Sequence, residues 1–165
     1  MSQFAFLPMS AIAAGVVGLI IAWFTFGYIR RQPAGSDRMR EIQEMIHTGA
    51  MAFLKREYTY LLPFLAIVAA LLAFMIGWPT ALAYVGGGLC SILAGLFGMQ
   101  AATSANARTS EAARAKGQAM ALRIAFNGGA VMGLSVASLG LLGIGLVIRA
   151  FLGSPESGDA WKQFS

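Results

Sequence analysis

Charge is scarce in this sequence. Its 165 residues include 12 Lys and Arg, 7 Asp and Glu, and a single His. A water-soluble domain carries about 25% charged residues, whereas this chain has 12%, together with 58% hydrophobic residues. Asp, Glu, Lys, Arg and His are all missing from residues 2–29, 58–107 and 124–148. This scarcity excludes an ordinary soluble domain and predicts an all-α integral membrane protein whose main surroundings are the lipid bilayer.

Residues that commonly build catalytic or metal sites are also few. Cys90 is the only cysteine, which excludes an internal disulfide or a cysteine cluster, and we expect it to be a small buried helix residue. His47 has no second ligand nearby in sequence, so we expect a solvated side chain rather than a metal ligand. The acids lie outside the apolar stretches and offer no ionisable path across a membrane: Asp37, Glu41, Glu44, Glu57, Glu111, Glu156 and Asp159. We therefore predict no catalytic, substrate-binding or metal residue in this chain.

The apolar stretches are long enough for four membrane helices. About 20 helical residues cross the hydrocarbon core, so the first and last stretches each allow one span and the middle one allows two. The expected spans are residues 8–29, 59–77, 80–102 and 124–148, joined by cytosolic connections at about 30–58 and 103–123. All of residues 1–165 then form one membrane-helix portion of a single domain.

Basic residues are concentrated in two of the connections. The first holds Arg30, Arg31, Arg38, Arg40, Lys55 and Arg56, and the second holds Arg108, Arg114, Lys116 and Arg123. By the positive-inside tendency both connections are cytosolic, which predicts a multi-pass protein of a bacterial inner membrane with its N-terminus outside. Arg108, Lys116 and Arg123 would share a face if their segment were one helix, but membrane anchors are a simpler interpretation than a polyanion site. No basic stripe alternates with aromatics, so a nucleic-acid partner is excluded.

Several local signals predict where helices begin, bend and pack. Pro33 and Gly35 should break the chain before a helix that starts at Ser36 or Asp37. That helix begins amphipathic, with an apolar stripe that needs a partner surface: Met39, Ile42, Ile46, Gly49 and Phe53. Pro63 predicts a kink. In "GWPT", Gly77 should end one helix and Pro79 should open the next.

Three further expectations concern the second half of the chain and the membrane mouth. The last helix should start near Ser110 and continue to Ala150. Gly129 and Gly133, four residues apart, predict a close helix crossing. Glu57, beside Lys55 and Arg56, should form an ion pair at the interface.

Three strings carry a more specific resemblance. "GSDRMREIQEMIHTGAMAFLKREYTYL", "GMQAATSANARTSEAARAKGQAMALRIAFNGGAVMG" and "GLSVASLGLLGIG" occur in this order. Together, over roughly residues 35–150, they resemble the N-terminal part of the membrane-bound, ion-translocating inorganic pyrophosphatases. The resemblance implies a homodimeric enzyme of about sixteen helical spans per subunit. It also implies hydrolysis of Mg²⁺-bound pyrophosphate in the cytosol and export of protons, or of sodium in some members.

The chain departs from that family in one important respect. The family's acidic motif, whose aspartates bind magnesium and whose lysine binds phosphate, is absent, so no site residue is carried over; a K⁺ requirement stays open. The leading hypothesis is an N-terminal fragment of such a pump, inactive alone and completed by C-terminal helices of the same polypeptide. A self-contained four-helix membrane scaffold and a split enzyme with a second polypeptide are the alternatives.

Overall fold

The computed structural model describes residues 6–152 and forms four long helices. They are α1 (Phe6–Arg30), α2 (Asp37–Met75), α3 (Trp78–Lys116) and α4 (Gln118–Leu152). Their 25, 39, 39 and 35 residues correspond to about 37, 58, 58 and 52 Å at the usual helical rise. Each helix is long and apolar enough to cross a membrane, which confirms the predicted all-α membrane architecture.

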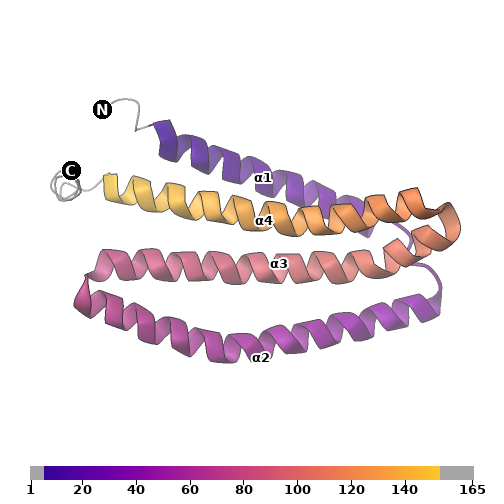
Figure 1. Ribbon diagram of the computed structural model, residues 1–165, viewed down its shortest axis with the longest axis horizontal. Helices are drawn as coiled ribbons and strands as arrows, with labels where there is room; N and C mark the ends of the chain where they lie inside the picture. The colour runs from indigo at the N-terminus through magenta and orange to yellow at the C-terminus, as the bar shows by residue number, and fades with distance from the viewer. Residues whose placement is uncertain (1–5, 153–165) are drawn as a thin grey trace.

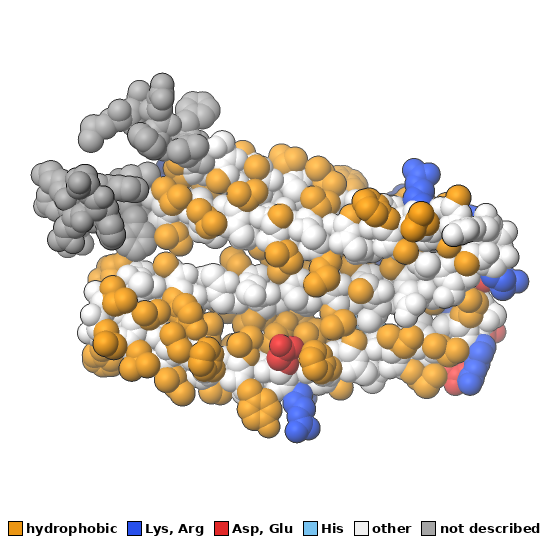
Figure 2. Space-filling model, viewed as in Figure 1, with side chains coloured by type: hydrophobic (Ala, Val, Ile, Leu, Met, Phe, Trp, Pro, Cys, Tyr) orange, Lys and Arg blue, Asp and Glu red, His pale blue; other side chains and the backbone are white. Residues whose placement is uncertain are grey.

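The helices form a row rather than a closed bundle (Figure 1). Within this row α4 packs against both α1 and α3, α1 also touches α3, and α2 packs against α3 alone. A row of helices encloses little interior, so Ile29 and Ile124 are the largest fully buried side chains among the described residues. Much of the apolar surface therefore faces outward (Figure 2).

Turn and cap chemistry sets the first two connections. Ser36 is the N-cap of α2, and the Met39 backbone N–H donates to its Oγ at 3.4 Å. Gly35 precedes it with φ +86°, a conformation that side chains rarely adopt. Gly77, with φ +141°, separates α2 from α3, and Pro79 occupies the first turn of α3. These observations confirm the predicted breaks at both places.

The predicted helix start near Ser110 is wrong. Residue 110 lies inside α3, where its hydroxyl donates to the carbonyl of Asn106 one turn earlier. The segment before Lys116 is rich in alanine, the strongest helix former, so nothing there interrupts α3. The break comes at Gly117, whose φ of +85° reverses the chain before α4 begins at Gln118.

Pro63 lies inside α2, and this helix is visibly bent near its middle (Figure 1). A proline has no N–H to donate and its ring crowds the preceding turn, which accounts for a bend in an otherwise continuous helix. The predicted kink is thus present.

Close helix approach depends on glycines other than those predicted. A Cβ added at Gly15 of α1 would lie 2.8 Å from the carbonyl oxygen of Ser138 in α4, and one at Gly128 of α4 would lie 2.8 Å from the Cβ of Ala105 in α3. Around Gly129 and Gly133, by contrast, an added Cβ would meet no atom within 4 Å. The predicted crossing at these two glycines is not made among the described residues.

Candidate functional site at the charged end

One end of the row, here called the charged end, carries the 31–36 loop, the start of α2 and the turn at Gly117. Basic side chains gather there and near the middle of α2 (Figure 2). The other end carries the α2–α3 turn and the last turn of α4, where Arg149 Nη1 lies 3.7 Å from the sulfur of Met9. The polar interactions between distant segments are concentrated towards the charged end.

Arg108 of α3 joins three elements at this end. Its Nε donates to the carbonyl of Gln32 at 3.2 Å, and its Nη2 donates to the carbonyl of Arg30 at 3.4 Å. Its Nη1 donates to the Ser104 carbonyl at 2.6 Å and to Oε1 of Gln43 at 3.4 Å. The last carbonyls of a helix have no partner within that helix, so Arg108 also caps the end of α1.

The setting of Arg108 disfavours free ligand binding. Burial, followed by the positive charge of Arg30, lowers the pKa of its guanidinium, although arginine stays protonated at neutral pH. All three of its nitrogens already donate to protein oxygens. Arg108 therefore acts as a clamp between α1, α2 and α3, and it does not share one helix face with Arg123, which lies on α4.

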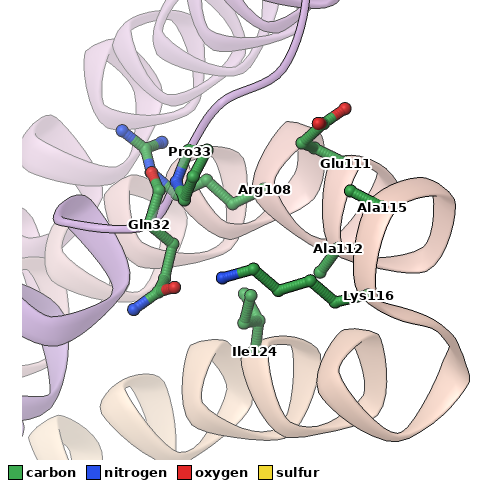
Figure 3. A pocket seen from close by; sticks show the side chains of 8 residues that line it. All are labelled: Gln32, Pro33, Arg108, Glu111, Ala112, Ala115, Lys116 and Ile124. Atoms are coloured by element: carbon green, nitrogen blue, oxygen red, sulfur yellow. The ribbon is translucent and has the colours of Figure 1, made fainter.

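A small cavity lies beside the clamp (Figure 3). It is lined by Gln32, Pro33, Arg108, Glu111, Ala112, Ala115, Lys116 and Ile124. Figure 3 shows the Lys116 side chain extending across it between Gln32 and Ile124. Its volume of about 30 Å³ holds only one or two water molecules, so it cannot admit a pyrophosphate ion.

His47 is not the solvated residue that the sequence predicted. It is half-buried on α2, and its Nδ1 lies 3.0 Å from Oγ1 of Thr103 on α3. The Thr103 hydroxyl donates its proton to the Met99 carbonyl at 2.9 Å, so it accepts a hydrogen bond from Nδ1–H of His47. Thr103 is itself buried, and this contact fastens the charged end of α2 to α3.

Two of the acids at this end pair with arginines one turn away on the same helix. Glu41 pairs with Arg38 at 2.7 Å and Glu111 pairs with Arg114 at 2.9 Å. The predicted ion pair of Glu57 is wrong, because among residues 6–152 it pairs with neither Lys55 nor Arg56. Adjacent residues point in different directions around a helix, which explains this outcome.

A metal site would require several of these side chains to meet. Within the described chain no three His, Cys, Asp or Glu side chains come together in that way. The side chains of residues 6–152 therefore do not fit a magnesium site. That catalytic, substrate-binding and metal residues lie elsewhere stays a prediction.

Cys90 is half-buried, rather than fully buried as expected, and faces α4. A Cβ added at Gly143 would lie 3.8 Å from its sulfur, which is ordinary contact. It is a free thiol within the α3–α4 interface.

Sequence reasoning missed the clamp and the buried Thr103 contact. Gln43, His47 and Leu54 recur at helical spacing and lie on the face of α2 that meets α3. Helical spacing indicates this face, but two of its three residues are polar, so the neighbouring apolar stripe gives the stronger sequence signal.

The fold and its charged end define a multi-helix integral membrane protein whose polar contacts between distant segments are concentrated towards one end of the helix row. Residues 16–164 match the family described as inorganic H⁺ pyrophosphatase, so the chain belongs to that family.

Individual relatives agree with this assignment. A protein of Clostridium tetani, provisionally named a K⁺-stimulated pyrophosphate-energised sodium pump, is 52% identical over 124 residues, covering 75% of this chain and 18% of the relative. The K⁺-stimulated pyrophosphate-energised sodium pump of Thermotoga maritima is 41% identical over 137 residues, covering 82% and 19%. A K⁺-insensitive pyrophosphate-energised proton pump of Pyrobaculum aerophilum is 40% identical over 150 residues, covering 86% and 21%. The chain thus spans about a fifth of the length of these relatives.

Proposed function

We propose that this chain is the N-terminal part of a pyrophosphate-energised cation pump, which hydrolyses inorganic pyrophosphate and moves protons or sodium out of the cytosol. The family match over residues 16–164 carries this proposal. Some of the relatives are named sodium pumps and others proton pumps, and their names also differ in the response to K⁺. The family therefore allows either ion.

In this proposal the chain supplies helical scaffold, while Mg²⁺ and pyrophosphate are bound by the remaining C-terminal helices. One observation supports this assignment: within the part of the chain that the structure describes, no three His, Cys, Asp or Glu side chains come together to hold a metal ion. The pump would act as a homodimer, as the resemblance implies.

The proposal places the charged end in the cytosol of a bacterial inner membrane. Arg30, Arg40, Arg108 and Arg114 all lie towards that end, and basic residues favour the cytosolic side of a membrane. The start of α1, at the opposite end of the row, would then lie outside.

A chimeric pump tests the proposal. The segment of the Clostridium tetani relative that aligns with this chain is replaced by the present residues, and inverted membrane vesicles are prepared. We expect Mg²⁺-dependent hydrolysis of pyrophosphate together with uptake of protons, read with a pH-sensitive dye, or of ²²Na⁺. The chain of residues 1–165 alone should hydrolyse no pyrophosphate.

The controls decide between outcomes. A version of the relative without the exchanged segment should be inactive, and the unaltered relative provides the reference rate. A chimera that inserts and remains monodisperse but hydrolyses nothing would contradict the proposal. Saturable hydrolysis by residues 1–165 alone would contradict the scaffold role.

A further inference from the structure

In the first half of α2, polar side chains face the neighbouring helix α3 and several apolar side chains are exposed. The face that meets α3 carries Gln43 and His47, which bond to Arg108 and Thr103. The apolar residues of these turns point away: Ile42 is 43% exposed, Met45 56%, Ile46 40% and Phe53 61%. We call these four residues, together with Gly49, the α2 stripe.

Lipid does not explain the exposure of this stripe. α2 is about 58 Å long, roughly twice the thickness of the hydrocarbon core. Its apolar second half, after Glu57, already supplies about 27 Å, so the first half stands outside the core. Ile42 and Ile46 lie about 20 and 14 Å beyond Lys55 on the charged side, in water unless protein covers them.

The stripe also has the shape of a helix-docking face. Ile42, Ile46, Gly49 and Phe53 recur at spacings of four, three and four, which places them on one side of α2. An added Cβ at Gly49 would meet nothing within 4 Å, so a second helix can approach closely there. Because α2 is the edge helix of the row and packs only against α3, no described helix occupies this position.

We infer that the α2 stripe is the docking site for an apolar helix face from the part of the pump that lies beyond residue 165. This inference rests on the proposed function and specifies where the remaining polypeptide packs. About four-fifths of the length of the pump relatives lies outside the segment matched here. Such a length offers ample chain to cover one cytosolic stripe.

A second copy of this chain fits less well. A two-fold contact limited to the stripe, whose four large side chains are only 40–61% exposed, would bury less than the roughly 1,000 Å² that a specific dimer needs. A helix of the same polypeptide meets the stripe at high effective concentration, so the same small area suffices. The occupant is therefore a covalently linked segment.

Cysteine labelling tests the inference in the chimeric pump. In a Cys90→Ser background, Ile46→Cys reports on the stripe, and Thr48→Cys is the matched control because it is exposed, nearby and on another side of α2. In inverted vesicles holding residues 1–165 alone, a membrane-impermeant maleimide should label both at similar rates. In the chimera the rate at Ile46→Cys should fall at least tenfold, while Thr48→Cys stays within twofold.

A second pair of variants does not depend on labelling. Ile46→Glu places a charge in the proposed contact and should lower the rate of pyrophosphate hydrolysis by the chimera at least tenfold. Thr48→Glu should change that rate less than twofold.

The remaining outcomes each support or overturn the docking site. Equal labelling at both positions in an active chimera would overturn the inference and leave the proposed function standing. Disulfide-linked dimers of the Ile46→Cys chimera on mild oxidation would also overturn it, in favour of a second copy. Protection of Ile46→Cys in an inactive chimera would support the docking site and overturn the function.

Discussion

The α1–α4 crossing allows a sharp prediction about two glycines. Gly15 faces α4 so closely that a Cβ there would lie 2.7 Å from Cγ of Leu142 and 2.8 Å from the carbonyl oxygen of Ser138. The Leu142 side chain can rotate away, but the Ser138 carbonyl is part of a helix backbone. Gly15→Ala therefore forces α1 away from α4 by several tenths of an ångström.

Gly133→Ala provides the matched comparison. It makes the same chemical change in a membrane helix, but the added methyl group would meet no atom within 4 Å. Alanine favours a helix interior over glycine by up to about 1 kcal/mol, so this variant should be neutral or slightly more stable. Overpacking usually costs about 1–3 kcal/mol, and after a propensity gain of up to about 1 kcal/mol Gly15→Ala should lose up to about 2 kcal/mol.

The assay is unfolding of the 165-residue chain in mixed micelles by increasing SDS, followed by tryptophan fluorescence and by circular dichroism. The fluorescence reports on unfolding of the helices that carry tryptophan, with Trp23 on α1 and Trp78 at the start of α3, and circular dichroism reports on the loss of helix. We expect the midpoint to move to lower SDS for Gly15→Ala and to stay or rise for Gly133→Ala. Equal destabilisation by the two variants would refute the assigned crossing.

Three further predictions concern the charged end. Gly35→Ala should lower the SDS midpoint by the equivalent of about 1–3 kcal/mol, because φ is +86° and the new methyl group would press on Met39 and Glu111. Ala34→Ser is a mild control. An unchanged midpoint for Gly35→Ala would argue against this turn. Arg108→Lys keeps the positive charge but loses the planar guanidinium that donates to several oxygens. Protease cleavage within the 31–36 loop should therefore accelerate several-fold in this variant, whereas Arg114→Lys should leave the cleavage rate unchanged. Equal cleavage rates for the two variants would contradict the clamp. The hydrogen bond from Arg114 and its charge lower the pKa of Glu111, so the pair's stabilisation is present above the unfolded pKa of about 4.5 and is lost as pH falls through the lower folded value. The SDS midpoint should therefore drop below pH 4.5 in the parent chain and vary less in Arg114→Gln, and identical pH profiles would count against the pair.

The number of helices and most of their ends could be predicted because each depends on a local signal. Uncharged stretches of sufficient length indicate spans, and Ser36, Gly77 and Pro79 act within one or two residues of the breaks they cause. The error near Ser110 has the same local origin, since serine often begins a helix. Only the positive φ of Gly117 distinguishes the true break, and alanine-rich sequence carries α3 past the serine.

The site was harder to predict because its contacts join residues far apart in sequence. Arg108 donates to backbone carbonyls of Arg30 and Gln32. Every residue type has a backbone carbonyl, so the sequence does not indicate these acceptors. His47 and Thr103 are 56 positions apart, so neither predicts the other. Glycine spacing likewise indicated that close crossings exist but not which glycines make them, because that depends on how each helix is rotated about its axis.

Helix rotation also explains why α2 presents an apolar stripe outward. Turning α2 about its axis would cover Ile42 and Ile46, yet it would withdraw His47 from Thr103 and Gln43 from Arg108 and would expose the buried Leu54. Polar groups left without partners in the contact would cost about 1–3 kcal/mol each, comparable with the gain from burying an isoleucine. The directional bonds to α3 therefore hold α2 in one rotation, and that rotation leaves the stripe available for a further helix of the pump.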